Sequence, residues 1–310
     1  MATIKELSAI PERLAPGHRL CAGCGASIAV RQVMLGAGDT DIVCGSATGC
    51  LEVSTTVYPY SAWKVPYVHN AFENAGATMS GVEAAFKGMK ATGKIPADKK
   101  IKFVTFGGDG GTYDIGLQSL SGAMERGHDI VYVCYDNNAY MNTGIQRSSA
   151  TPKGAWATTS ETGSVQHGKK EKRKDLTSIM AAHHLPYVAQ ASIGDWKDLV
   201  AKAEKAIAVD GPAFLNVLAP CPRGWRIPSN QTIEIARMAI NSKFWPLFEV
   251  EDGKWSMKEV SEKKLIPVVD FMRPQGRFSH LFKPTENTEL IEEIQADVDA
   301  YYEYVKGRCC

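Results

Sequence analysis

Two short, mostly apolar runs with one amphipathic segment between them constrain the fold of this chain more than any other feature. Ile101–Phe106 (IKFVTF) and Ile130–Tyr135 (IVYVCY) have the length and composition of buried strands. Between them Leu117, Leu120 and Met124 follow the three- and four-residue spacing of a helix. Strands that are apolar throughout are buried on both faces, so the sequence predicts an α/β fold: a parallel sheet with helices on both faces.

The same alternation of helix and strand continues on either side of this unit. Further helices are expected over Ser27–Leu35, Asn74–Met89 and Trp196–Ala208, and further strands over Asp41–Cys44 and Ala213–Leu218. In an open parallel sheet, ligands bind at the carboxyl ends of the strands. The loops that follow the strands are therefore where we expect the chemistry.

The alternation weakens in the last third of the chain. Residues 1–221 are expected to form one binding domain, and residues 222–310 a C-terminal extension that packs on this domain or on a partner subunit. Within the extension, Glu251–Gly253 predicts a hairpin turn, and Glu289–Val305 a final helix. A polar loop at 148–174 precedes the extension, and loops of this length are usually functional or mobile.

Charge and composition exclude several classes of protein. The 310 residues carry 35 Lys and Arg against 34 Asp and Glu, a balance that argues against a nucleic-acid binder. There is no long uncharged apolar run, so no membrane span is expected. The start of the chain is charged and lacks the apolar core of a signal peptide, which favours a cytoplasmic location.

A glycine-rich segment directly after the first of the two central strands carries the clearest chemical signal. Gly107–Gly111 reads GGDGG, and one strand–helix–strand unit separates Asp109 from Asn137. Both residues are therefore expected at the tips of adjacent parallel strands. Glycines let a backbone approach a diphosphate closely, and a following helix offers N–H groups to an anion. The Asp109 carboxylate and the Asn137 carbonyl are hard oxygen ligands suited to Mg²⁺.

Two other interpretations of these segments stay open at this point. Glycine-rich turns after strands are common, and neighbouring asparagines often form only a turn. A dinucleotide site uses a similar loop, but the G-x-G-x-x-G spacing is absent, and Asp109 would repel a bare pyrophosphate. The combination of the two segments across one strand favours a diphosphate bridged by a cation.

Four of the eight cysteines have the spacing of a metal centre. Cys21 and Cys24 form a C-x-x-C pair just before a predicted helix, whereas Cys50 and Cys221 stand alone near the ends of strands. In a reducing compartment, clustered cysteines more often bind metal than form disulfides. Four thiolates suit a [4Fe–4S] cluster or a structural zinc ion, and the single C-x-x-C pair favours the cluster because zinc usually draws on two.

The other cysteines have structural interpretations. Cys44 competes with Cys50 for the third ligand position but lies within a predicted strand. Cys134 lies inside an apolar strand and is expected to be a buried core thiol. Cys309 and Cys310 end the chain, where a mobile tail is expected.

Several longer segments resemble one enzyme family. GDG followed by NN is similar to the thiamine-diphosphate signature, and the surrounding segments resemble the beta subunit of pyruvate:ferredoxin oxidoreductase, within the 2-oxoacid:ferredoxin oxidoreductase family. These segments are APGHRLCAGCGAS (15–27), ATGCLEV (47–53), HNAFENAGA (69–77), GGDGGTYDIGLQSLSGAMERGHDI (107–130), YDNNAYMNTGIQRSSATP (135–152) and APCPRGW (219–225).

The resemblance implies a domain that binds thiamine diphosphate, Mg²⁺ and a [4Fe–4S] cluster. The cofactor-binding residues that it implies are Gly108, Asp109, Gly110, Asn137 and Ala139. Of these, Asp109, Asn137 and the backbone carbonyl of Ala139 would hold Mg²⁺. Asn142 would lie near the reactive thiazolium as a catalytic residue. The implied cluster ligands are Cys21, Cys24, Cys50 and Cys221.

The same resemblance implies a reaction and partners. The reaction is the oxidative decarboxylation of pyruvate with coenzyme A to acetyl-CoA and CO₂, with electrons passed to ferredoxin. Related enzymes act on oxalate, 2-oxoglutarate and branched or aromatic 2-oxoacids. Only the diphosphate half of the thiamine site is recognisable here, so the sequence predicts an alpha subunit that supplies the pyrimidine half, beside other subunits. A non-redox thiamine enzyme with zinc, and a metal-binding scaffold without activity, are the rival hypotheses.

The run Lys169–Lys174 (KKEKRK) has two interpretations. In most proteins such a run is the solvated part of a loop. The sharper hypothesis is that its positive charge steers an acidic ferredoxin to the enzyme.

Overall fold

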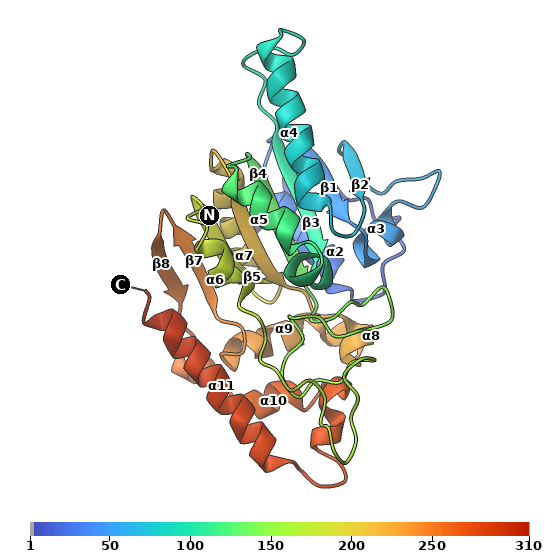
Figure 1. Cartoon of the computed structure of the whole chain (residues 1–310), viewed down its shortest axis with the longest axis vertical. Coiled ribbons are helices and arrows are strands. Elements are labelled where there is room, and N and C mark those ends of the chain that lie inside the picture. The colour runs from blue at the N-terminus through green and yellow to red at the C-terminus, as the bar shows by residue number, and fades with distance from the viewer. Residues whose placement is uncertain (1–2, 310) are drawn as a thin grey trace.

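An eight-stranded sheet forms the centre of the molecule (Figure 1). The structure is a computed structural model and describes residues 3–309. The strands are β1 (Ile42–Ala47), β2 (Tyr67–Asn70), β3 (Lys102–Gly108), β4 (Ile130–Asp136), β5 (Tyr187–Ser192), β6 (Ala213–Leu218), β7 (Leu247–Glu251) and β8 (Lys254–Lys258). They lie in the order β2-β1-β3-β4-β6-β5-β7-β8, and all pairs from β2 to β5 are parallel.

Helices cover both faces of this sheet, as the sequence predicted. The helices of residues 3–309 are α1 (Ile4–Ala9), α2 (Gly25–Gly36), α3 (Cys50–Thr55), α4 (Ala75–Ala91), α5 (Leu117–Glu125), α6 (Leu176–Ala181), α7 (Trp196–Ala208), α8 (Pro222–Trp225), α9 (Thr232–Asn241), α10 (Val268–Met272) and α11 (Thr288–Lys306). Helices α2 and α7 pack on one face and share a core with strand residues such as Val131 and Leu215. Helices α4, α5 and α6 pack on the other face against Tyr132 and Phe214.

The strand sequences follow from this double cover. Strands β4, β5 and β6 are buried at every position, and β3 at every position but its last. Strands β2 and β5 lie outside the sequence-based predictions because both are interrupted by polar residues. In β5 the buried Gln190 accepts a hydrogen bond from Thr177 and donates one to the Pro246 carbonyl, so a polar side chain is stable in the core.

The residues after position 221 join the same sheet. Strand β7 pairs antiparallel with β5 and then with β8, and the turn between them places Asp252 and Gly253 at positive φ, as a type I′ hairpin requires. Helices α8 to α11 form a third core with Leu218 at the end of β6. Figure 1 shows these helices gathered, with the polar loop, at one end of the sheet.

The end of the chain differs from the expected mobile tail. Cys309 forms an isolated bridge with Trp255, and its thiol donates to the Val305 carbonyl at 3.4 Å. Residue Cys310 lies outside the described residues. Among residues 3–309, none of the helices has both the length and the apolar character needed to cross a membrane.

The basic run at 169–174 is anchored at both ends and exposed in its middle, so its interpretation as a solvated stretch holds only for Lys170, Glu171 and Lys172. Lys169 is buried and donates to the carbonyls of Ser149 and Thr151, and burial lowers its pKa to about 8. Arg173 forms an ion pair with the buried Asp136 at 3.0 Å. Lys170 remains exposed. The sequence did not reveal this because these contacts span 18 to 37 residues and form only when the loop folds back on itself.

Candidate active site

The tips of β3 and β4 lie side by side and carry the residues predicted to bind the cofactor. The two strands pair in parallel with Gly108 opposite Tyr135, so Asp109 and Asn137 leave the sheet at the same edge. A pocket of about 430 Å³, counting the part that opens to solvent, lies at this edge. Its lining includes Gly108, Gly110, Asn137, Ala139 and Asn142, the predicted residues other than Asp109, and also Cys50.

The glycines of GGDGG are needed for close packing rather than for a left-handed backbone. Gly110 and Gly111 open a short π-helix (Gly110–Asp114) and keep a negative φ. A side chain at Gly110 would overlap the Tyr140 ring, and one at Gly111 would press on the ring of Phe72 at 3.3 Å. Two aromatic rings thus lie directly on this backbone and form one wall of the pocket.

Asp109 is a buried carboxylate whose protein partners carry no positive charge. It is 1% exposed, accepts a hydrogen bond from the Asn137 backbone N–H at 3.2 Å, and accepts another from the Ser148 hydroxyl. Burial, and then the nearby Asp136, raise the pKa of Asp109 well above its ordinary value. A charged carboxylate in such a place requires a cation.

Three oxygen-bearing groups converge beside it. One terminal atom of the Asn137 side-chain amide lies 2.8 Å from an Asp109 oxygen and 2.9 Å from the Ala139 carbonyl oxygen. As an NH₂ group this atom donates to both oxygens; as a carbonyl oxygen it forms a trio with the oxygens of Asp109 and Ala139. We call Asp109, Asn137 and the Ala139 carbonyl the oxygen site. The trio fits a hard cation such as Mg²⁺.

The neighbouring carboxylate, Asp136, has the opposite environment. It is fully buried, but it accepts hydrogen bonds from Arg173 at 3.0 Å and Tyr113 at 2.7 Å, and from the Asn138 side chain at 2.6 Å. Arg173 also stacks on the Trp245 ring at 4.1 Å. Asp136 is therefore already neutralised, which leaves Asp109 as the carboxylate available to a metal. The sequence did not reveal that Asp136 is neutralised and Asp109 is not, because nothing in the local sequence distinguishes the two aspartates.

The four predicted ligand cysteines lie near one another at the same end of the sheet. All six pairs among Cys21, Cys24, Cys50 and Cys221 are close enough for a charge on one sulfur to raise the pKa of another. Their loops are tied together, since the Gly25 N–H donates to the Pro220 carbonyl at 3.2 Å. We call these four residues the thiol site.

The surroundings of the thiol site favour cysteine sulfurs that ligate a metal over free thiolates. Backbone N–H groups face the sulfurs of Cys24 and Cys221. Burial raises the pKa of Cys24 to about 11 and that of Cys50 to about 12, so a metal would displace protons from these thiols. Between residues 3 and 309, no group of three or more His, Cys, Asp or Glu is arranged to hold a metal ion. The thiols are neighbours, but they do not form a closed ligand set.

The remaining cysteines of the interior lie apart from the thiol site. Cys44 and Cys134 are 0% exposed and belong to the two apolar cores of the sheet. Cys134 is therefore a core thiol, as the sequence predicted. Cys44 has the environment of a packing residue, so Cys50 is the better candidate of the two for ligation.

One side chain separates the oxygen site from the thiol site. The Tyr135 ring would be 3.3 Å from a side-chain carbon on Gly108, and its hydroxyl would be 3.0 Å from one on Gly49, the residue before Cys50. On the far side of the pocket, Met141 packs against Gly224 in α8, which begins after Cys221. The two sites thus lie on either side of Tyr135, and Cys50 is the residue of the thiol site that lines the pocket.

Comparisons with known proteins agree with this geometry. Residues 47–217 match the model of the thiamine pyrophosphate enzyme C-terminal TPP-binding domain. The chain is 52% identical to pyruvate synthase subunit PorB of Thermotoga maritima, over 93% of this chain and 89% of that protein. Identity is 51% to PorB of Methanocaldococcus jannaschii, over 93% and 94% of the two chains.

A relative with a different substrate name and one solved structure complete the picture. The ketoisovalerate oxidoreductase subunit VorB of Pyrococcus furiosus is 44% identical over 98% of this chain and 96% of that protein. A solved 2-oxoglutarate:ferredoxin oxidoreductase from Magnetococcus marinus has the same fold, with a TM-score of 0.54 and 24% identity over 73% of this chain and 78% of that one.

Proposed function

Because this chain belongs to the family of the pyruvate synthase PorB subunits, the beta subunits of 2-oxoacid:ferredoxin oxidoreductases, we propose that it binds Mg²⁺ and a [4Fe–4S] cluster beside its thiamine diphosphate and acts on pyruvate. The family membership makes the chain one subunit of a multi-subunit oxidoreductase with a thiamine-diphosphate-binding domain. The metals, the substrate and the electron acceptor are the proposal.

The observation that carries the proposal is the meeting of two ligand sets at one pocket. Asn137 and Ala139 of the oxygen site line the pocket, and so does Cys50 of the thiol site. A reaction that removes electrons from a carbon atom needs an acceptor close to the place where they are released. A site that only bound thiamine diphosphate would have no need of four thiols next to it.

Mg²⁺ would be held by Asp109, Asn137 and the Ala139 carbonyl. It would supply the positive charge that balances the buried Asp109 carboxylate and a bound diphosphate. Ser148 donates to the second oxygen of Asp109 and so fixes the orientation of the carboxylate. When bound, thiamine diphosphate supplies the electron sink for loss of CO₂ from a 2-oxoacid.

Other residues of this chain would shape the reaction space. Asn142 lines the pocket on an exposed loop and would orient the substrate through its amide. The rings of Phe72 and Tyr140 contact each other edge-on, with centroids 5.7 Å apart, and would exclude water from the diphosphate side. Cys21, Cys24, Cys50 and Cys221 would hold the cluster that accepts electrons singly before they pass to ferredoxin.

Pyruvate is the proposed substrate because the PorB proteins are named pyruvate synthase subunits and show 51–52% identity in two of the examples above. The VorB relative shows that similar chains carry the name of another 2-oxoacid enzyme. Coenzyme A would accept the acyl group. The non-redox alternative, a thiamine enzyme with zinc in the thiol site, requires the same residues and is separated by experiment.

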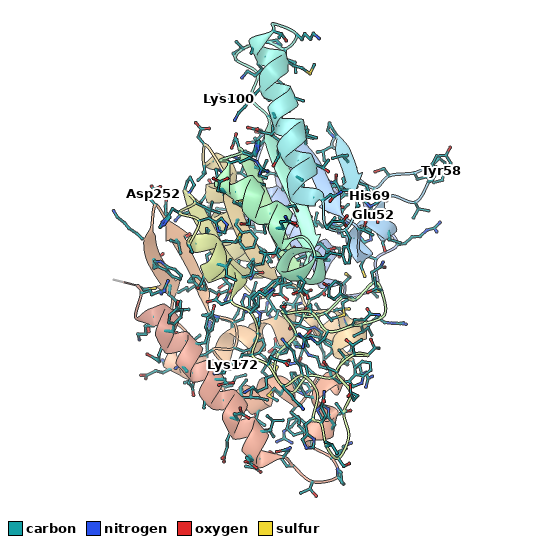
Figure 2. The ribbon with its side chains drawn as sticks, in the orientation of Figure 1. Glu52, Tyr58, His69, Lys100, Lys172 and Asp252 are labelled. Atoms are coloured by element: carbon teal, nitrogen blue, oxygen red, sulfur yellow. The ribbon has the colours of Figure 1, made fainter. Side chains whose placement is uncertain are left out.

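An alpha subunit is expected to cover the pocket. The pocket is lined by residues of the proposed diphosphate-binding segments, and the pyrimidine half would come from another chain. Exposed hydrophobic side chains follow Cys50 in the chain: Val53 in α3 is 49% exposed, Tyr58 94% and Tyr60 78%. Figure 2 shows Tyr58 at the tip of a projecting loop, on the side of the molecule that carries Glu52 and His69. This surface is suited to burial by a partner subunit.

The test uses the complex purified without oxygen. Iron, acid-labile sulfide and the visible spectrum are measured for the wild type, for Cys50→Ala and for the matched control Cys44→Ala. We expect four fewer irons in Cys50→Ala than in the wild type, no loss in Cys44→Ala, and bleaching of the wild type by pyruvate with coenzyme A. Zinc in place of iron, or a cluster that no 2-oxoacid reduces, would leave only the non-redox alternative.

A further inference from the structure

Arg277 is a buried cation in the C-terminal extension. It has no role in the proposed reaction. It lies in the 3₁₀ helix Gly276–Leu281, is 2% exposed and stacks on the Trp225 ring at 3.7 Å. Its Nε donates to Gln275 at 2.8 Å and its Nη1 to the side chain of Asn138 at 3.1 Å. Both partners are neutral, and Nη2 is buried without a partner.

The position of this guanidinium links the two sites. Asn138, which it contacts, follows Asn137 of the oxygen site. Trp225, on which it stacks, ends the short helix α8 that begins directly after Cys221. The indole N–H of Trp225 donates to the Asn137 carbonyl at 2.7 Å. Arg277 therefore lies against both loops that bring the cofactor and the thiols together.

A buried cation of this kind needs an anion. Burial lowers the pKa of Arg277 to about 9, and the anionic groups that oppose this effect are Asp136, Cys221 and Asp109. Asp136 is already paired with Arg173 at 3.0 Å, and Asp109 faces the proposed cation. Cys221 becomes a thiolate when it ligates a cluster, and its negative charge is then the one left for Arg277 to balance.

We propose that Arg277 sets the reduction potential of the cluster bound through Cys221, by placing a fixed positive charge beside it. This inference rests on the proposed function, since it requires a cluster in the thiol site. Reduction adds one electron to the cluster and makes its total charge more negative by one unit, with no bond formed or broken and no proton moved. A neighbouring positive charge stabilises the reduced form more than the oxidised form, so the potential rises.

The test is a redox titration of the anaerobic complex with dithionite, followed by the visible spectrum and by electron paramagnetic resonance. Arg277→Met and Arg277→Gln remove the charge, and Arg277→Lys keeps it. We expect a roughly tenfold loss in the equilibrium constant for reduction in the neutral variants, which is about 59 mV toward negative potential for a one-electron couple. Arg277→Lys restores most of the wild-type potential.

A matched control removes a buried cation at the opposite end of the same sheet. Lys102 begins β3, is 5% exposed and pairs with Asp129. Lys102→Met is expected to leave the midpoint potential unchanged even where it lowers the melting temperature. A purely structural role for Arg277 would move the melting temperature in the same way as Lys102→Met and leave the potential in place.

The outcomes separate this inference from the proposed function. Wild-type complex without iron refutes the proposed cluster. Iron-replete Arg277→Met and Arg277→Gln with the wild-type potential, or with the same shift as Arg277→Lys, overturn the role of the charge. If both neutral variants fail to keep iron while Arg277→Lys keeps it at an unchanged melting temperature, the charge requirement is supported by iron content instead.

Discussion

The oxygen site and the thiol site lie at the same end of the sheet, but the protein builds them in different ways. Asp109 and Asn137 follow two paired strands, so the register of β3 and β4 brings them together before any ligand binds. The four cysteines come from three separate segments and do not form a closed ligand set in residues 3–309. Regular secondary structure therefore preorganises the first site, whereas the second would be completed only by the proposed cluster.

The strongest test of this difference is the loss of the carboxylate. Asp109→Ala is expected to weaken binding of Mg²⁺ and thiamine diphosphate by the complex by more than about 100-fold, because loss of an outer partner alone costs about 10- to 100-fold. Iron content is expected to stay at the wild-type level. Calorimetry and iron analysis measure both, with Asp98→Ala, at an exposed carboxylate, as the control. Parallel loss of iron would show that the sites are not independent.

The reciprocal change removes one thiol. Cys221→Ala is expected to lose the cluster, since three thiolates cannot complete the fourfold ligation. Binding of thiamine diphosphate with Mg²⁺ should persist because Asp109 and Asn137 are held by the strands. The measurements are iron content and calorimetric titration of the same sample. Loss of cofactor binding with the iron would mean that the cluster also organises the oxygen site.

A substitution outside both sites can weaken the attachment of the loop that carries Ser148. Lys169→Met leaves the carbonyls of Ser149 and Thr151 without their buried donor, which is expected to cost about 1–3 kcal/mol of stability. The neighbouring Lys170→Met, at an exposed position, should change stability by less than about 0.5 kcal/mol. Denaturant unfolding of the complex compares the two. Equal changes in stability for the two variants would support the interpretation of 169–174 as a solvated run.

A smaller effect is expected for the hydroxyl that orients Asp109. Ser148→Ala should weaken Mg²⁺ binding by about tenfold, the lower end of the range for outer partners of a metal ligand. Ser149→Ala is the matched control because its hydroxyl donates to Asp114 instead. Calorimetric titration with Mg²⁺ in the presence of thiamine diphosphate checks the pair. Equal weakening in both variants would point to the loop as a whole.

The mildest prediction concerns pH. The pKa of Asp109 is raised in the folded protein, so the metal-free protein retains a proton there after the unfolded chain has lost it. Stability of the metal-free protein therefore falls as pH rises from about 3.9, the unfolded value, through the folded pKa. Mg²⁺ must displace this proton, so its affinity rises with pH over the same window. Calorimetry in buffers of different ionisation enthalpy counts the protons released.

Local patterns in the sequence predicted the parts of the site that depend on local structure. Apolar runs located β3 and β4, and the residues at their tips followed from strand pairing. The four thiols were implied by resemblance, and their spacing alone left zinc open. Arg173 and Arg277 escaped prediction because the ion pair of Arg173 with Asp136 and the hydrogen bond of Arg277 to Asn138 form only in the folded chain.

The loop fastened by Lys169 has a consequence for biosynthesis. Lys153 and Lys172, on the same loop, pair with Asp297 of α11 at 2.9 and 2.7 Å. The helix that anchors the loop over Asp109 is therefore synthesised after both β3 and β4. A nascent chain that has completed β3 and β4 still lacks the anchor of the loop that carries Ser148. We expect chains stalled before α11 to bind thiamine diphosphate weakly. The coenzyme would therefore bind mainly to chains in which α11 has already folded.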